Sequence, residues 1–289
     1  MKITEEKGKV VIGEVCDFNP VHTFMCGQCF RWDETDGIFI GTAYGKTVAV
    51  KSISDTEFEI LNTTKADFEK IWMDYFDFNT DYSKIKKALS GDFNLKKAID
   101  FGGGIRILNQ DPFECLISFI ISTQNSIPRI KKIIAKMSEM FGEEIVFDGR
   151  KYYAFPSCDV LCTLTEADLA PLKVGYRAAY ILDAAKKVKS GEVDVYNLKN
   201  LDTASARSEL LKIKGVGPKV ADCVLLFSMK KHDSFPIDVW IGRIMRSLYL
   251  DENASMKDIL KYSNEKFSSL AGFAQQYLFY YARENKLIG

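Results

Sequence analysis

The feature that most constrains the fold is a change in hydrophobic patterning near residue 65. Before this point, short runs rich in β-branched and aromatic residues are separated by Gly and Asp turns, a pattern typical of antiparallel strands. After it, apolar residues recur at helical spacing. The sequence therefore predicts an α+β protein in which an antiparallel sheet precedes a mostly helical region. The expected strands lie at 10–12, 29–32, 38–40, 47–50 and 58–60.

Helix start signals support the helical half of this division. Asp111, Pro112 and Glu114 fit the N-cap, N1 and N3 positions of a helix over 113–122. We expect a sheet domain at residues 1–95 and a helical domain at residues 96–289. Further helices are expected at 127–141, 165–172, 177–190, 204–212, 218–229, 239–248 and 271–284. The glycines at 102–104 lack the spacing of a phosphate loop, so we expect a flexible joint there.

Composition excludes several classes of protein. With 289 residues, 47% of them hydrophobic, the chain can bury a sizeable core. Acidic and basic residues balance at 39 each, which excludes a uniformly basic protein that coats DNA but leaves room for a local basic face. No apolar run approaches the ~20 residues of a membrane span, and Met1 to Val11 lacks a signal-peptide core. We expect a cytoplasmic protein without a membrane partner, nucleoid-associated in a prokaryote or nuclear in a eukaryote.

Histidine and cysteine usage limits the chemistry further. The chain contains only His22 and His232, which nearly excludes histidine-based triads and metal clusters. Its seven cysteines are scattered and odd in number, which suits reduced thiols. Cys26 and Cys29 form a C-x-x-C pair, but no second pair completes four metal ligands, so no metal site is expected. Catalytic machinery must therefore rest on Lys, Asp, Cys or backbone groups.

The segment from Leu211 to Lys219 indicates a helix, a tight glycine hairpin and a second helix. Gly215 and Gly217 would permit positive φ angles and the close approach of another backbone. Gly217 can also cap the second helix, with Pro218 at its first position. Backbone N–H groups at such a helix N-terminus form a natural phosphate site. The glycines alone fit an ordinary turn between two helices equally well.

Lys219 and Asp238 favour catalysis over a plain turn. A lysine in the first helical turn meets the positive end of the helix dipole, which disfavours the ammonium form, and an amine must be neutral to act as a nucleophile. Asp222 and Cys223, three and four residues on, are expected beside it on one face. Asp238 begins the next predicted helix and needs no function as an N-cap. Directed at Lys219, it could stabilise positive charge that develops on a sugar.

These features resemble the HhH-GPD superfamily of DNA glycosylases, whose members share the hairpin, the following lysine and the later aspartate. Within it the chain resembles the 8-oxoguanine DNA glycosylase/AP lyases. The alkylated-base glycosylases share the fold and the aspartate but lack the lysine. The motifs that carry the resemblance span nearly the whole chain. They lie at 27–32 (GQCFRW), 110–115 (QDPFEC), 175–177 (GYR), 215–223 (GVGPKVADC), 236–239 (PIDV) and 271–275 (AGFAQ).

The resemblance implies a mechanism without metal or other cofactor. The damaged nucleotide would be extruded from duplex DNA containing oxidised guanine, and the protein would act as a monomer. Lys219 would attack C1′ of the sugar, release the base and form a Schiff base, after which β-elimination would cut the strand. Asp238 would stabilise the sugar cation. The absence of a C-terminal cysteine cluster implies no iron–sulfur cluster of the endonuclease III kind.

The resemblance also assigns the base pocket. Gly27 would offer its carbonyl to the N7–H that oxidised guanine has and normal guanine lacks. Gln275 would contact the Watson–Crick edge. Phe279 and Cys223 would cover the two faces of the base.

A second group of residues would contact the rest of the DNA. Arg129, Tyr176 and Arg177 match positions that address the opposite cytosine and the gap in the duplex, and Gly215 and Gly217 belong to the phosphate-binding hairpin. Two residues depart from the eukaryotic pattern. Gln124 replaces an asparagine that fills the gap, and Trp240 replaces a histidine that contacts phosphate.

A different class of function competes with this interpretation. A non-catalytic DNA-binding protein could use the helix–hairpin–helix only to hold phosphates. Such a binding module would need neither Lys219 nor Asp238, so these two residues discriminate between the alternatives.

Overall fold

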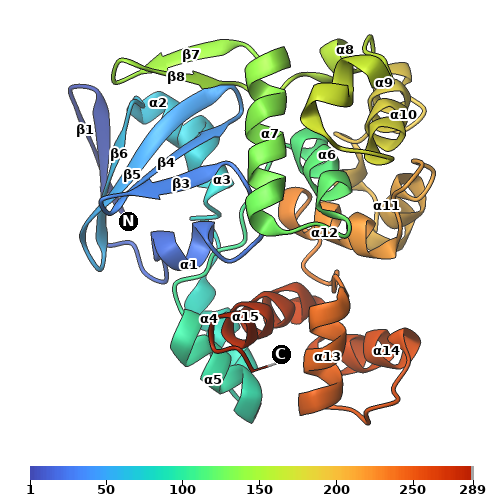
Figure 1. The fold of residues 1–289 in the computed structure, drawn as a ribbon. Helices are drawn as coiled ribbons and strands as arrows, with labels where there is room; N and C mark the ends of the chain where they lie inside the picture. Colours follow the sequence, from blue (N-terminus) through green and yellow to red (C-terminus); the bar gives the residue numbers. More distant parts are fainter. Residues whose placement is uncertain (288–289) are drawn as a thin grey trace.

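The computed structural model describes residues 1–287 and contains a six-stranded antiparallel sheet followed by a mostly helical region (Figure 1). The predicted fold class is therefore confirmed. Within residues 1–287, no helix combines the length and the apolar character needed to cross a bilayer.

The sheet has the strand order β1-β2-β6-β5-β4-β3, and every neighbouring pair is antiparallel. The strands are β1 (Lys2–Glu6), β2 (Lys9–Gly13), β3 (Trp32–Thr35), β4 (Ile38–Ala43), β5 (Lys46–Ser54) and β6 (Glu57–Leu61). The strand expected at 29–32 begins only at Trp32, because Cys29 and Phe30 lie in a buried loop, where Cys29 packs in the core of the sheet and Phe30 in the helical core. The edge strand β1 was missed because four of its five residues are polar, so it shows little apolar alternation.

One face of the sheet forms its own hydrophobic core. Val10 and Ile12 of β2 pair with Ile60 and Phe58 of β6, and all four side chains are buried. The short helices that follow β6 cover this face, and their Trp72 belongs to the same cluster. Alternation along the strands thus places the apolar side chains on the covered face.

The helical region follows the predicted pattern closely at 127–141, 177–190, 239–248 and 271–284. The helix expected at 165–172 is divided, because Pro171 lacks the N–H that would continue α-helical bonding. A small hairpin, β7 (Glu144–Phe147) and β8 (Arg150–Tyr153), interrupts the helices and was not predicted. The helices and helical turns are α1 (Pro20–Phe24), α2 (Lys65–Asp67), η1 (Phe68–Trp72), α3 (Met73–Tyr75), α4 (Tyr82–Leu89), α5 (Phe93–Gly102), α6 (Pro112–Ser122), α7 (Ile127–Phe141), α8 (Cys158–Leu161), α9 (Glu166–Leu169), η2 (Ala170–Leu172), α10 (Arg177–Ser190), η3 (Leu198–Asn200), α11 (Thr203–Leu210), α12 (Pro218–Ser228), α13 (Val239–Leu248), α14 (Met256–Phe267), η4 (Ser268–Leu270) and α15 (Ala271–Glu284).

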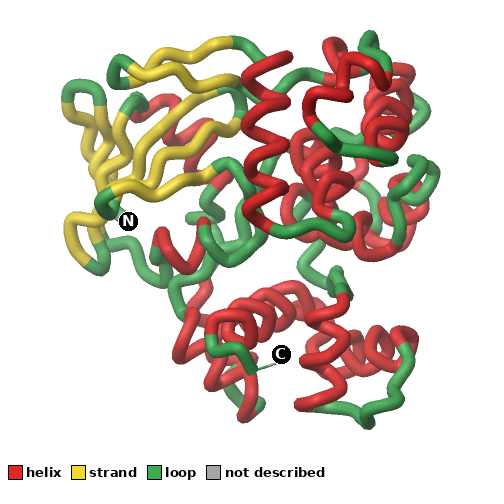
Figure 2. The backbone as a smooth tube through the Cα atoms, in the orientation of Figure 1, coloured by secondary structure: helices red, strands yellow, loops and turns green. Residues whose placement is uncertain are grey.

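The helices form two groups, as the tube in Figure 2 shows. One contains α6 to α12, and the other brings α4 and α5 against the C-terminal α13, α14 and α15 (Figures 1 and 2). The large helical core includes Tyr82 of α4, and it also includes Cys26 and Phe30 from the loop before β3. The domain division at residues 95 and 96 stays a prediction.

The glycines at 102–104 form a fixed contact and not the flexible joint we expected. A Cβ on Gly104 would lie 2.4 Å from the Cβ of Asn19, and the N–H of Asn19 donates to the Gly104 carbonyl at 2.9 Å. Asn19 is also the N-cap of α1. The close approach of two chain segments explains the glycine better than flexibility does.

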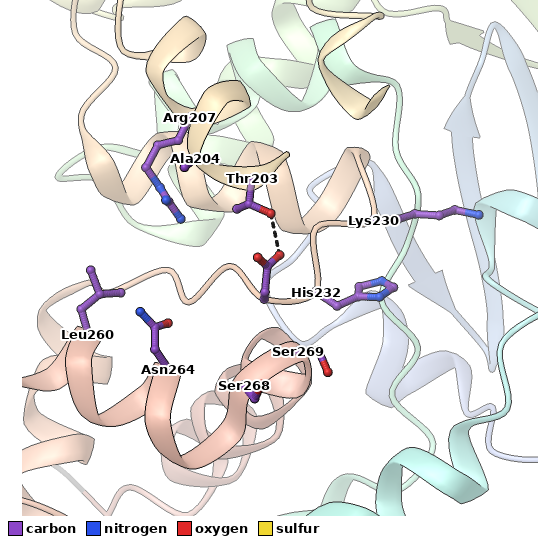
Figure 3. Close-up of a pocket in the computed structure, with 10 residues that line it drawn as sticks. Thr203, Ala204, Arg207, Lys230, His232, Leu260, Asn264, Ser268 and Ser269 are labelled. Atoms are coloured by element: carbon purple, nitrogen blue, oxygen red, sulfur yellow. Dashed lines mark hydrogen bonds between the residues drawn. The ribbon is translucent and has the colours of Figure 1, made fainter. Parts of the chain in front are cut away.

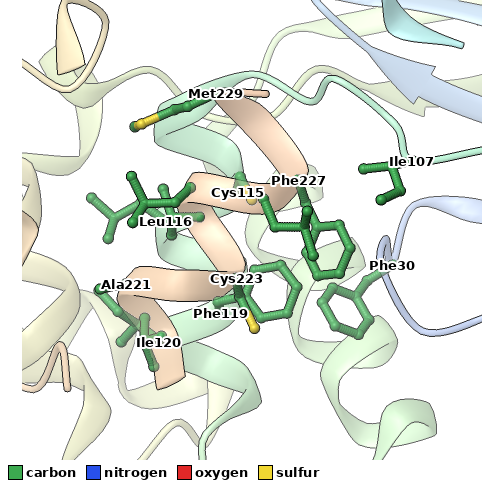
Figure 4. Packing of buried hydrophobic residues seen from close by; sticks show 14 of the residues in the cluster. Phe30, Ile107, Cys115, Leu116, Phe119, Ile120, Ala221, Cys223, Phe227 and Met229 are labelled. Atoms are coloured by element: carbon green, nitrogen blue, oxygen red, sulfur yellow. The ribbon is translucent and has the colours of Figure 1, made fainter. Parts of the chain in front are cut away.

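Helices α6 and α12 form the centre of the helical core (Figure 4). Phe119 of α6 stacks on Phe227 of α12 with ring centroids 5.5 Å apart. Phe30, from the loop before β3, meets Phe119 at 5.6 Å. This aromatic row connects the loop that precedes β3 to the helix that carries Lys219.

Candidate functional site

Several regions of the surface are hollow, and two of them show how differently their charged side chains are paired. A cavity of about 650 Å³ lies between α11, α14 and the loop after α12 (Figure 3). Its charged side chains already have partners: Arg207 binds Asp222 at 2.7 Å, and Lys230 binds Asp74 at 2.5 Å. None of the residues predicted for the site lines it. Size alone therefore does not identify the site.

The second region is a cavity of about 360 Å³ where predicted residues from distant parts of the chain meet. Gly27, Lys219, Asp238 and Phe279 all line it. An adjoining cavity of about 600 Å³ shares Lys219 and Asp238 with the first. The adjoining cavity also borders Gln124, Gly215 and Gly217.

The hairpin needs its two glycines for different reasons. Gly215 has a φ of +81°, and a Cβ there would lie 2.2 Å from the ring of Tyr180. Gly217 has a φ of −98° and no atom within 4 Å of an added Cβ, so the positive φ expected there is wrong. Gly217 is the N-cap of α12 with Pro218 in its first turn, as predicted. The single left-handed residue at 215 suffices to reverse the chain.

Lys219 is partly buried in the first turn of α12 and makes few contacts. Its Nζ lies 3.4 Å from Oγ of Ser122 and 5.1 Å from the ring centroid of Phe119. Among residues 1–287 no carboxylate lies within ion-pair distance of this amine. Within the described residues the amine thus faces the cavity with weak polar contacts, to the Ser122 hydroxyl and to the Cys223 thiol.

Asp238 is partly buried across the cavity and caps α13. Its Oδ1 accepts a hydrogen bond from the N–H of Ile241 at 2.8 Å. Lys219 and Asp238 line the same cavity but do not form an ion pair within the described residues. The space between them is open.

Asp222 does not accompany Lys219 as expected. Its Oδ1 accepts a hydrogen bond from Nε of Arg207 at 2.7 Å and lies 2.7 Å from Nη2 of the same guanidinium in an ion pair. Burial raises the pKa of Asp222 to about 6, opposed by the Arg207 charge. Asp222 therefore joins α11 to α12 on the side away from the cavity.

Cys223 and Gln275 are buried and do not border the open cavity. Burial raises the pKa of the Cys223 thiol to about 11, although the nearby Lys219 charge opposes this. Oε1 of Gln275 has no hydrogen-bond partner among the described residues. A buried acceptor without a donor costs ~1–3 kcal/mol.

Gly27 lies so close to α15 that an added side chain would be crowded. Its φ is +89°, and a Cβ would lie 3.2 Å from Nη1 of Arg283 and 3.3 Å from Cε1 of Phe279. Arg283 lines the cavity and was missed by the sequence reasoning. Its position one turn beyond Phe279 on the same helical face was the available signal.

The cavity has further lining residues that no motif indicated. Ser122 ends α6, Asn125 follows in the next turn, and both border the two adjoining cavities. Trp240, which departs from the eukaryotic pattern, lines both cavities as well and is 41% exposed. The available signal was that Ser122 ends the helix predicted at 113–122 and that Asn125 follows it closely.

Arg177, which the resemblance places near the opposite cytosine and the gap in the duplex, is buried. Its guanidinium donates to the carbonyls of Thr123 and Gln124 and to that of Val174 at 3.2 Å. Gln124 adopts a left-handed φ of +48° in this turn. Arg177 therefore holds the turn between α6 and α7.

Arg129 and Tyr176 remain exposed beside this turn. Nη2 of Arg129 donates to the Lys173 carbonyl at 3.3 Å. Tyr176 is 53% exposed, and its hydroxyl lies 3.5 Å from Oε1 of Gln124. These two side chains are free to meet a partner.

Titratable clusters do not point to a metal. Among residues 1–287, no group of three or more His, Cys, Asp or Glu side chains could hold an ion. Cys26 and Cys29 are both buried, and burial raises the pKa of each thiol.

Comparison with known proteins gives consistent matches over most of the chain. Residues 10–116 match the family described as 8-oxoguanine DNA glycosylase, N-terminal domain, and residues 117–269 match the HhH-GPD superfamily base excision DNA repair protein family. A probable N-glycosylase/DNA lyase of Methanothermobacter thermautotrophicus is 34% identical over 68% of this chain and 69% of its own. The N-glycosylase/DNA lyase OGG1 of Arabidopsis thaliana is 28% identical over 89% of this chain and 75% of its own.

A solved structure is more similar still. The Clostridium acetobutylicum 8-oxoguanine glycosylase/lyase, in complex with double-stranded DNA containing cytosine opposite 8-oxoguanine, is 47% identical to this chain. It superposes with a TM-score of 0.97 over 99% of both chains.

Proposed function

The chain belongs to the HhH-GPD superfamily of base excision DNA repair proteins, and from this premise we propose that it is an 8-oxoguanine DNA glycosylase and AP lyase. Its substrate is duplex DNA that contains oxidised guanine. The observation that carries the proposal is the convergence of Lys219 and Asp238 on one cavity that Gly27 and Phe279 close from the other side.

Lys219 is the nucleophile of this reaction. After losing a proton, its ε-amine attacks C1′ of the extruded nucleotide, and the electrons of the N-glycosidic bond leave with the base. Opening of the sugar ring gives an imine between Nζ and C1′. Loss of a proton from C2′ then expels the 3′-phosphate and cuts the strand. The sparse contacts of Lys219 leave its amine free to reach the sugar.

Asp238 stabilises the positive charge that develops on the sugar as the base departs. Its bond to the N–H of Ile241 fixes the carboxylate at the start of α13. Cys223 does not compete as a nucleophile, because a thiol with a pKa near 11 stays protonated at neutral pH.

The base is recognised from the side of α15. The Gly27 carbonyl accepts the N7–H of 8-oxoguanine and repels the N7 lone pair of guanine. Phe279 stacks on the base, Cys223 covers its other face, and the unpartnered Oε1 of Gln275 accepts a donor of the Watson–Crick edge. The N7–H is a donor that only the lesion presents, whereas the donor on the Watson–Crick edge is present in any guanine.

The opposite strand is addressed by the exposed Arg129 and Tyr176, and Arg177 supports the turn that carries Gln124. Gly215 and Gly217 present the N–H groups of the hairpin to a phosphate. The protein acts as a monomer and without a membrane partner. It works in the cytoplasm at the nucleoid, or in the nucleus of a eukaryote.

One assay separates this function from non-catalytic DNA binding. Duplexes with a single 8-oxoguanine opposite each of the four bases are incubated with the protein, and base release and strand cleavage are scored separately. We expect both products, and borohydride should trap a covalent protein–DNA adduct. An undamaged duplex is the control. Tight binding without base release would favour the non-catalytic alternative.

A further inference from the structure

The loop from Met25 to Gln28 has one carbonyl without a partner, and it belongs to Gly27. Among residues 1–287 the Gly27 carbonyl accepts no hydrogen bond, whereas its neighbours on both sides accept one from a side chain. Gly27 lines the cavity that holds Lys219. The loop is therefore bonded so that one acceptor remains available.

Helix α15 supplies two of the donors that hold this loop. Nη2 of Arg283 donates to the Met25 carbonyl at 2.5 Å, and Nε2 of Gln276 donates to the Cys26 carbonyl at 3.1 Å. The two donors lie two helical turns apart and so share one face of α15. They hold the two peptide carbonyls directly before Gly27.

The third donor holds the other side of the loop. Nε2 of Gln110 donates to the Gln28 carbonyl at 2.8 Å, and the N–H of Gln110 donates to the Phe227 carbonyl at 2.9 Å. Gln110 thus ties the loop to the end of α12. Gly27 is held between α15 and the helix that carries Lys219.

Arg283 connects the loop to the predicted stacking residue. Its guanidinium carbon lies 5.7 Å from the ring centroid of Phe279 and 5.6 Å from that of Tyr280. Its Nη1 would lie only 3.2 Å from a Cβ on Gly27. One side chain therefore sets the spacing between the Gly27 loop and Phe279.

We infer that Arg283 is a positioning residue for lesion recognition, because it fixes the Gly27 carbonyl against α15. This inference rests on the proposed function. Guanine and 8-oxoguanine differ at N7 by a lone pair and an N–H. A carbonyl that could turn aside would escape repulsion by guanine, so discrimination requires an acceptor that is held in place. Gln276 and Gln110 support the same constraint.

The test compares two substrates with one variant. Arg283→Met keeps an unbranched apolar stem but removes the donors. Under single-turnover conditions we expect excision of 8-oxoguanine to fall ~10-fold or more, while cleavage at a pre-formed abasic site stays within about 2-fold. Arg283→Lys, which retains a charged donor, should recover part of the loss.

Glu284→Gln is the matched control. It removes the ion pair between Arg283 and exposed Glu284 but leaves the Met25 carbonyl bond in place, so both activities should be unchanged. If Arg283→Met does not fold, Gln276→Met removes the adjacent donor and should show the same selective loss.

The outcomes separate the inference from the proposed function. Equal loss on both substrates in a folded variant, or no loss on either, overturns the positioning role while the function stands. Failure of the unaltered protein to excise 8-oxoguanine overturns both.

Discussion

The cavity that contains Lys219 has two walls that are held in different ways. The hairpin wall carries Lys219 and Asp238, and the α15 wall carries Gly27 and Phe279. On the hairpin wall, Lys219 makes only weak polar contacts, with Ser122 at 3.4 Å and with the Cys223 thiol, and Asp238 accepts a bond from its own helix. On the α15 wall, the loop around Gly27 is held by three side-chain donors, and a Cβ on Gly27 would lie 3.3 Å from Cε1 of Phe279.

The roles proposed for the two walls account for this difference. A nucleophile travels to the sugar and then changes its bonding, so strong hydrogen bonds to Lys219 would have to be broken during the reaction. A group that distinguishes two bases by one proton must not move, because its selectivity depends on a fixed position. Substitutions at the loosely bonded nucleophile and at the tightly held recognition loop should therefore affect different steps of the reaction.

The largest effect is expected on the loosely bonded wall, at Lys219. Lys219→Gln should bind lesion DNA but lose base release by ~10⁴-fold and form no borohydride adduct, because no other side chain replaces the amine. Single-turnover excision and adduct formation measure both. Lys189→Gln, at an exposed position on α10, is the control. Unimpaired strand cleavage by Lys219→Gln would contradict the assignment of the nucleophile.

Asp238→Asn should have the second largest effect. A cap alone is worth roughly 1 kcal/mol, whereas stabilisation of a cationic transition state predicts a loss of ~10²-fold or more in rate with binding retained. Asp202→Asn alters a comparable N-cap on α11, away from both cavities that contain Lys219, and should cost stability only. Equal rates for the two variants would reduce Asp238 to a cap.

The tightly bonded wall is tested at Gly27. Gly27→Ala adds a Cβ within 3.3 Å of Phe279 and should depress 8-oxoguanine excision roughly 10-fold more than cleavage at an abasic site. Both rates are measured under single-turnover conditions. Gly8→Ala also places a side chain at positive φ, +77°, but in open space between β1 and β2, and controls for backbone strain. Parallel loss on both substrates would indicate disturbed docking or folding.

The smallest effect is expected at Arg129, near the turn at Gln124. Arg177, beside the same turn, is buried and bonded to backbone carbonyls, whereas Arg129 is exposed. Exposed Arg129 is free to contact the opposite base, so excision opposite C should exceed that opposite A by ~10-fold, and Arg129→Ala should flatten this ratio. Excision kinetics opposite all four bases provide the measurement. Arg150→Ala, at an exposed site on β8, is the control. An unchanged ratio would make Arg129 an ordinary surface charge.

Local signals explain why much of the fold was predictable. Caps, N1 prolines and periodic apolar residues act over four or five positions, so α7, α10, α13 and α15 have the predicted bounds. Edge strand β1 and the hairpin β7–β8 were missed because few of their residues are buried, and their place in the protein depends on partners elsewhere.

The candidate site was also predictable from sequence only in part. The order of Gly215, Lys219 and Asp238 along the chain, together with the GVGPK hairpin, was sufficient to predict a lysine nucleophile near a carboxylate. Sequence could not show that Asp222 turns to Arg207, or that Arg283 holds the Gly27 loop. Sequence by itself determined α7, α10, α13 and α15 and indicated candidate groups for chemistry, because these signals depend on neighbouring residues. Only the tertiary structure decided which of those groups are held and which are free, because hydrogen-bond partners come from segments far apart in the chain.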